Sequence, residues 1–244
     1  MAAIVVVASA VGVAIALSIP WFPPQASKQA HAVDTLYTVL LVVSVAIFAI
    51  VQTVVLFSVW KFRMRPGEEQ RDGPPIHGNA RLEIIWTALP ALLIAGLCTY
   101  AFLVLRHDEK RHASELEVDV VGQQFAWQFS YPMPGGSKLV SDQLYLPYNR
   151  PVHFHVKGLD VIHEFWIPAF RLGVDAVPGI TTTLRATPGR LGTYPVVCTE
   201  LCGVGHATMR AALHVVTPQQ FQAWLTSHRD PSGSVPAFPP TGSG

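Results

Sequence analysis

Two cysteines, one histidine and one methionine lie within a single short segment near the end of this chain. The segment reads Cys198-Thr-Glu-Leu-Cys202-Gly-Val-Gly-His206-Ala-Thr-Met209. A further histidine, His163, lies upstream at another expected strand junction. Thiolate and thioether sulfurs are soft ligands that favour copper over hard cations, so these residues predict a copper site.

The number of cysteines favours two copper ions rather than one. A mononuclear blue-copper site uses one Cys, two His and a weak axial Met. Here there is one cysteine more, and two thiolates can bridge two coppers that each have one histidine as terminal ligand. Met209 is then a weak axial ligand on one copper, and the backbone carbonyl of Glu200 serves the other. Sharing one electron over two bridged metals limits rearrangement on reduction, which suits fast electron transfer.

Three other interpretations of the segment stay open from the residues alone. The cysteines can form a disulfide, because an exported domain lies in an oxidising compartment. The set can also bind structural zinc as Cys2His2, or a single copper. Zinc explains neither Met209 nor its position three residues after His206.

Short strands are expected to position these residues. They are rich in Val, Phe, Tyr and Thr, are separated by Gly, Pro and Asn turns, and indicate a β-sandwich or barrel. A short helix follows, with Thr217 as N-cap and Pro218 at its first position, and ends near His228. The expected strands are 116–122, 124–131, 151–157, 180–186, 192–198 and 209–216.

Three apolar stretches precede the strands, at 2–20, 35–60 and 84–105. The second and third extend over about 39 and about 33 Å as helices, enough for the ~30 Å core of a bilayer. The first lacks a preceding Lys or Arg, which disfavours a signal peptide, although Ala30 and Ala32 suit a cleavage site. The expected divisions are therefore 1–33 as signal peptide or extra membrane helix, 34–106 as transmembrane hairpin, 107–228 as copper domain and 229–244 as disordered tail.

Charge predicts the orientation in the membrane and excludes one class of partner. Before residue 35 the only basic residue is Lys28. The positive-inside rule therefore puts the 61–82 loop in the cytoplasm and everything after Leu105 outside. The net charge of +1 argues against a nucleic-acid partner. The basic residues of the loop are Lys61, Arg63, Arg65, Arg71 and Arg81.

The copper segment and the apolar hairpin together resemble subunit II of cytochrome c oxidases, in the haem–copper oxidase family. Its outer domain is a cupredoxin that holds the binuclear copper centre CuA. The resemblance covers residues 35–228 and implies an α+β membrane protein: a transmembrane helix hairpin and a cupredoxin-like Greek-key β-barrel. The family's ligand pattern falls on His163, Cys198, Glu200 (through its carbonyl), Cys202, His206 and Met209. Other shared motifs are His77-Gly-Asn79, Leu82-Glu83-Ile-Ile-Trp86-Thr-Ala-Leu-Pro90 and Asp175-Ala-Val-Pro-Gly179.

The resemblance also implies partners and further roles. CuA accepts electrons from a cytochrome c-like donor and passes them to haem in subunit I, which reduces oxygen and pumps protons. The resemblance further implies subunit III and membrane lipid as partners, and the plasma membrane of a bacterium as the location. The Glu200 side chain is expected to help hold a magnesium ion shared with subunit I, or else to be a solvated carboxylate. Glu83 is expected to be a proton-uptake acid, or else an interfacial charge.

The sequence departs from the family at its aromatic cluster. The family's Trp-Tyr-Trp is Phe125-Ala126-Trp127 here, with Phe125 at the family's electron entry point. Either Phe125 or Trp127 is the candidate entry residue, or a different donor docks. No Cys-x-x-Cys-His occurs, so the chain carries no covalently attached haem and needs a separate donor. An acidic face for a basic cytochrome is expected from Glu115, Glu117, Asp119, Asp142, Asp160 and Glu164.

Three rival functions differ from this expectation in identifiable ways. A quinol oxidase subunit II shares the hairpin but lacks the thiolate pair. Nitrous-oxide reductase carries a similar copper loop on a soluble chain beside a large propeller domain. A membrane-anchored copper-delivery protein needs exposed, exchangeable ligands.

Overall fold

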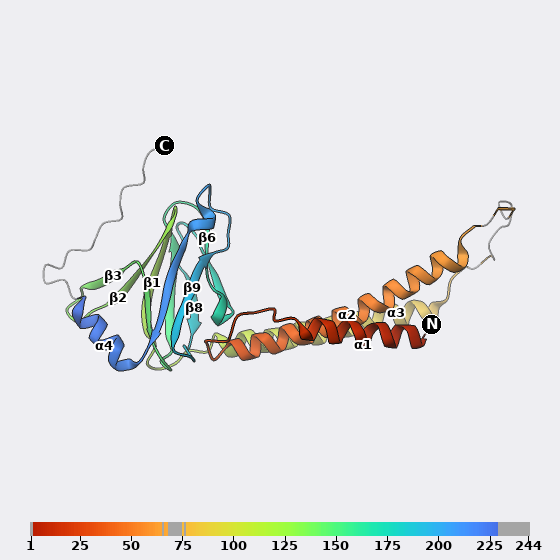
Figure 1. Ribbon diagram of the computed structural model, residues 1–244, viewed down its shortest axis with the longest axis horizontal. Coiled ribbons are helices and arrows are strands. Elements are labelled where there is room, and N and C mark those ends of the chain that lie inside the picture. The colour runs from red at the N-terminus through yellow and green to blue at the C-terminus, as the bar shows by residue number, and fades with distance from the viewer. Residues whose placement is uncertain (1, 65, 68–74, 76, 229–244) are drawn as a thin grey trace. The chain divides into compact units, whose positions relative to one another are not determined.

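The computed structural model describes residues 2–64, 66–67, 75 and 77–228 (Figure 1). The chain divides into two compact units, Met1–Trp21 with Thr35–Val104, and Phe22–Asp34 with Leu105–Gly244. The predicted tail 229–244, together with Arg65 and Arg71, lies outside the described residues.

The first unit contains helix α1 (Ala2–Ser18) and most of helices α2 (Ala30–Phe62) and α3 (Ala80–Asp108). The predicted spans 35–60 and 84–105 lie inside α2 and α3, which are both long and apolar enough to cross a membrane. Large apolar side chains along them are exposed, as in Phe48 (65%) and Leu92 (73%). A surface of this kind suits lipid rather than water.

Side-chain hydrogen bonds fix the start of α3. The Asn79 side chain accepts a hydrogen bond from the Leu82 N–H (3.2 Å), and the Glu83 carboxylate accepts one from the Asn79 N–H (3.3 Å). Asn79 therefore caps α3.

Helix α1 approaches α2 at Gly12, where an added Cβ would lie 2.9 Å from Val45 Cγ1. Glycine permits this close helix contact.

The second unit is a sandwich of two five-stranded sheets, with strand orders β3-β2-β1-β5-β8 and β4-β10-β9-β6-β7. Two pairs are parallel, β1 with β5 and β4 with β10, and the others are antiparallel. The strands are β1 Leu116–Gln123, β2 Ala126–Pro132, β3 Lys138–Ser141, β4 Leu144–Pro147, β5 Val152–Gly158, β6 His163–Ile167, β7 Leu172–Ala176, β8 Thr182–Ala186, β9 Gly192–Cys198 and β10 Arg210–Val216. This confirms the predicted cupredoxin-like fold and adds β3, β4, β6 and β7 to the six predicted strands.

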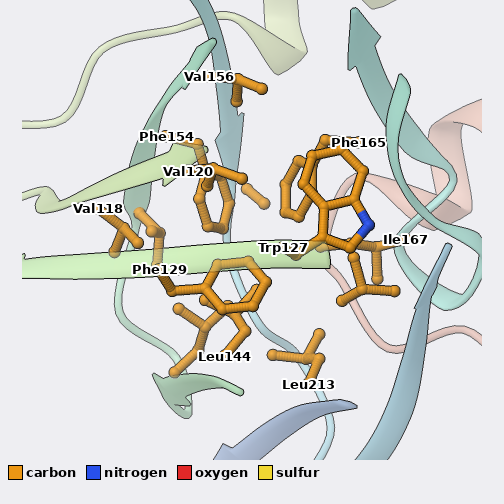
Figure 2. Packing of buried hydrophobic residues seen from close by; sticks show 14 of the residues in the cluster. Val118, Val120, Trp127, Phe129, Leu144, Phe154, Val156, Phe165, Ile167 and Leu213 are labelled. Atoms are coloured by element: carbon orange, nitrogen blue, oxygen red, sulfur yellow. The ribbon is translucent and has the colours of Figure 1, made fainter. Parts of the chain in front are cut away.

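The core of the sandwich lies between the two sheets. Alternate residues of each strand face inward, as in β5, where Val152, Phe154 and Val156 are fully buried. Figure 2 shows Phe154 and Val120 from one sheet facing Phe165 and Ile167 from the other. Burying an apolar side chain of this size contributes about 1.5–3 kcal/mol, so this layer holds the sheets together.

A short helix closes one edge of the sandwich. Helix α4 (Pro218–Ser227) begins at Thr217, whose side chain forms a capping box with Gln220. Trp224 of α4 stacks on Tyr145, with ring centroids 4.3 Å apart, so the helix is fixed to the edge strand β4. This confirms the predicted N-cap.

Residues 22–34, here called the strap, belong to the β-sandwich unit. The Ala26 N–H donates to the Ala169 carbonyl (2.8 Å), and the Lys28 N–H donates to the Thr187 carbonyl (3.0 Å). Asp34 pairs with Arg171 at 2.7 Å. Ala30 is completely buried, so a cut after Ala30 would detach packed residues of this unit.

Candidate metal centre

The predicted metal ligands gather at one end of the sheet that contains β6 and β9. His163 begins β6 and Cys198 ends β9. These strands are antiparallel, with Phe165 opposite Cys198, so both residues lie at the same end. The Cys198 N–H donates to the Met209 carbonyl (3.2 Å), which closes the 199–208 loop before β10 begins.

Two sulfur atoms form the middle of the cluster. The Sγ atoms of Cys198 and Cys202 are 3.9 Å apart, and both cysteines are free. A disulfide bond needs about 2.05 Å. The structure therefore holds two separate thiols in contact, the arrangement that two bridging thiolates require.

Each sulfur contacts two further donor atoms. Cys198 Sγ lies 3.9 Å from His163 Nδ1 and 3.3 Å from the Glu200 carbonyl oxygen. Cys202 Sγ lies 3.6 Å from His206 Nδ1 and 3.8 Å from Met209 Sδ. A closed zinc site takes four ligands, fewer than are gathered here. The sulfur site is defined as His163, Cys198, the Glu200 carbonyl, Cys202, His206 and Met209.

Burial sets the electrostatics of the sulfur site. His163 and Met209 are fully buried, and Cys202 is 4% exposed. Burial and the adjacent Cys198 thiol raise the pKa of Cys202 to about 11. Two neighbouring thiolates are therefore costly here without a compensating cation, and a soft metal cation is the species that would stabilise both.

Asp160 positions the His163 ring. Its Oδ1 accepts a hydrogen bond from His163 Nε2 (2.8 Å), and its Oδ2 accepts one from the Gln124 N–H (2.7 Å). Burial opposes ionisation, but these hydrogen bonds and that from the Val161 N–H hold the pKa of Asp160 below its usual range. With the proton on Nε2, Nδ1, which faces the Cys198 sulfur, is the nitrogen that could bind a metal. Sequence reasoning placed Asp160 only in an acidic face, although its position three residues before His163 was a readable signal.

Gln124 and Phe125 support the 199–208 loop, here called the ligand loop. The Gln124 side-chain amide donates to the Cys202 carbonyl. The half-buried Phe125 ring lies against Gly203 and Gly205, where an added Cβ at Gly205 would meet the ring at 2.5 Å. Sequence reasoning missed Gln124, since this contact joins residues 78 positions apart.

Trp127 lies among the buried core residues inside the sandwich (Figure 2). It is 2% exposed, and its ring centroid is 6.0 Å from that of His163 and 5.6 Å from that of Phe165. Within the described residues, its indole N–H has no hydrogen-bond partner. Trp127 therefore contacts His163 but does not reach solvent, whereas the half-buried Phe125 lies against the 199–208 loop.

Glu200 and Glu83 are the remaining predicted residues. The Glu200 side chain is exposed on the ligand loop. Glu83 contributes to the N-terminal cap of α3 in the helical unit.

Two carboxylates of the expected acidic face form ion pairs with basic side chains within the sandwich. Glu115 pairs with Arg185 (3.2 Å) and Asp119 with Lys138 (2.6 Å). Glu117 contacts two histidines. The face therefore presents less negative charge to a basic partner than the sequence suggests.

Comparisons with known proteins agree along most of the chain. A family model described as "Cytochrome C oxidase subunit II, periplasmic domain" matches residues 134–216, and its "transmembrane domain" counterpart matches residues 12–104. The cytochrome c oxidase subunit 2 of Thermostichus vulcanus is 35% identical and aligns with 83% of this chain and 76% of its own length. The corresponding Synechocystis sp. protein is 30% identical and aligns with 89% of this chain and 81% of its own length. A solved periplasmic domain of cytochrome oxidase subunit II from Bradyrhizobium japonicum is 29% identical, with a TM-score of 0.45 over 48% of this chain and 96% of that one. The chain belongs to the cytochrome c oxidase subunit II family.

Proposed function

We propose that this chain is the electron-accepting subunit of a bacterial cytochrome c oxidase, with a binuclear copper centre in its sulfur site. The observation that carries the proposal is the pair of buried thiols 3.9 Å apart, each in contact with one imidazole. When bound, the copper pair supplies a one-electron centre between a cytochrome c-like donor and the haem of subunit I, where oxygen is reduced to water and protons are pumped.

The ligand roles follow from the contacts of the sulfur site. Cys198, Cys202, His163 and His206 would hold the copper pair through their sulfur and ring nitrogen atoms. Met209 and the Glu200 carbonyl would be the weak ligands, one from each side of the sulfur pair. Burial holds these donors in one arrangement and excludes water, which favours electron transfer with little rearrangement.

Burial also argues against copper delivery as the function. A delivery protein must release its metal to another protein, which requires accessible ligands. Cys198, Cys202 and Met209 are 7%, 4% and 0% exposed, so they suit a resident metal. The thiol pair likewise argues against a quinol oxidase subunit.

Exposed apolar residues beside the sulfur site suit protein partners. Leu201 is 79% exposed and Val204 is fully exposed, both on the ligand loop. Ile162, next to the ligand His163, is 47% exposed. We assign this apolar rim to docking of subunit I or the donor. Phe125 lies against the same loop, and Trp127 contacts His163, so these two aromatics are the candidate electron route.

The remaining assignments complete the proposal. The exposed Glu200 carboxylate would share a magnesium ion with subunit I, and Glu83 would take up protons. Subunit III and membrane lipid are the further partners. The 61–82 loop would be cytoplasmic, and the sandwich would lie on the outer side of the plasma membrane.

Electron paramagnetic resonance of the copper-loaded full-length chain tests this proposal. We expect hyperfine structure from one electron shared by two copper nuclei. The same chain, purified from membranes, should carry a haem protein with it. Hyperfine structure from one copper, or a metal content dominated by zinc, would overturn the copper assignment. Copper without an associated haem protein would favour a delivery protein.

A further inference from the structure

A second cluster of ligand-type side chains lies on the outer face of the other sheet. In β5, burial alternates so that His153 and His155 both point away from the core. The parallel register of β1 with β5 puts Glu117 directly opposite His153. Two histidines and one carboxylate therefore share one face of two neighbouring strands.

Their donor atoms converge. One carboxylate oxygen, Oε2 of Glu117, lies 3.0 Å from His153 Nδ1 and 2.7 Å from His155 Nε2. One ligand atom from each residue lies within 4.8 Å of the other two. Neighbouring ligands of a tetrahedral zinc ion with bonds of about 2.0–2.1 Å are about 3.3 Å apart, so small side-chain movements would admit an ion.

The charge balance of this face leaves Glu117 available. Glu115 and Asp119, two residues to either side, pair with Arg185 and Lys138. Within the described part of the chain, the contacts of the Glu117 carboxylate are with the two imidazoles, which carry no fixed charge. One carboxylate thus lacks a lysine or arginine partner in the place where two imidazoles meet it.

The orientation and exposure of the rings suit a ligand arriving from solvent. The side chain of His155 is 34% exposed and that of Glu117 is 47% exposed. His153 is more enclosed, at 13%, and its Nδ1 faces the carboxylate. Its Nε2 is buried without a partner among the described residues, and its Nδ1 also lies 3.9 Å from Oε2 of Glu115.

We propose that Glu117, His153 and His155, here called the outer-face site, bind a zinc ion. Two imidazole nitrogens and one carboxylate oxygen, with no sulfur, form a donor set that zinc commonly uses, with a further position left for water. On binding, each imidazole stays neutral and carries its proton on the nitrogen that does not face the metal. The ion would join β1 to β5, and the site is independent of copper in the sulfur site.

Zinc titration of the full-length chain in detergent tests this inference. Both cysteines of the sulfur site are first replaced (Cys198→Ser with Cys202→Ser), so that thiolates do not compete for zinc. In this parent we expect one tightly bound zinc per chain and a rise in unfolding temperature on zinc addition. Glu117→Gln and His155→Gln should each weaken zinc binding by about 100-fold or more, since loss of even an outer-shell partner typically costs about 10–100-fold.

Asp119→Asn is the matched control, because it removes a carboxylate from the same strand face without removing a proposed ligand. We expect it to change zinc affinity by less than about 10-fold, the lower end of an outer-shell loss. Unfolding temperatures without zinc should agree among all variants, which excludes misfolding. Zinc binding that is unaffected by Glu117→Gln and His155→Gln, or no stronger than millimolar in the parent, would overturn the inference. Neither result bears on copper in the sulfur site.

Discussion

The sulfur site and the outer-face site, both proposed to bind metal, differ in burial and in the type of donor atom. The sulfur site is largely buried, draws half of its donors from the 199–208 loop and offers sulfur. The outer-face site is open to solvent, draws its donors from two strands and offers only nitrogen and oxygen. Donor softness and burial together predict slow metal exchange at the first and fast exchange at the second.

Support from neighbouring residues separates the two sites further. His163 is held by Asp160, which is itself held by the Gln124 and Val161 backbone N–H groups. In the outer-face site, the carboxylate that contacts the imidazoles is itself a proposed ligand. Metal affinity in the sulfur site should therefore depend on residues that do not touch the metal.

The largest expected effect is on copper(I) affinity. Replacing both sulfur-site cysteines by serine should lower it by about 1,000-fold or more, since two directly bound donors are lost and even outer-shell losses cost about 10–100-fold. His153→Gln with His155→Gln should leave it unchanged within a factor of about two, because those donors lie in the other sheet. Competition with a copper(I) chelator measures both. Retention of copper by the serine variant, or its loss from the histidine variant, would contradict the division between the sites.

Removal of the positioning carboxylate gives the next largest effect. Asp160→Ala should weaken copper binding by about 10–100-fold, the typical cost of losing a partner that orients a metal-bound histidine. Asp160→Asn keeps an oxygen acceptor for His163 Nε2 and should recover most of that loss. Copper affinity and the unfolding temperature of the metal-free chain are measured together. A purely structural role would lower the unfolding temperature and leave the affinity of the folded chain unchanged.

The two sites also differ in how far the sequence reveals them. The donors of the sulfur site, apart from His163, lie within twelve residues, so their types and spacing alone predict the cluster. The outer-face site depends on the parallel register of β1 with β5, which puts Glu117 beside a histidine 36 positions away. No local pattern specifies that pairing.

The same reasoning explains which elements the sequence predicts. Strong alternation and a proline-started helix identify β1, β5 and α4, whereas β3 and β4 have four residues each and give little periodicity. The sequence pattern assigns most of the strap to the N-terminal apolar segment. Its packing depends on contacts with residues 169–189, far along the chain.

The smallest effect is expected at Trp127, which connects the sulfur site to the core that both sites share. Trp127→Phe removes the indole N–H, which is buried without a partner among the described residues. Leaving such a donor unsatisfied costs about 1–3 kcal/mol, and its removal offsets the packing lost with the second ring. We expect the unfolding temperature to change by no more than about 4 °C, whereas Trp127→Ala should lower it by about 10 °C or more.

This pair of variants separates packing from electron transfer. With stability kept, any fall in cytochrome c oxidation by an assembled oxidase carrying Trp127→Phe comes from the ring itself, whose centroid lies 6.0 Å from that of His163. Phe125→Leu, whose side chain packs against the 199–208 loop, is the matched variant for the other aromatic. A large loss of stability in Trp127→Phe would mean that the indole N–H has a partner, and the electron-transfer comparison would then rest on Phe125 alone.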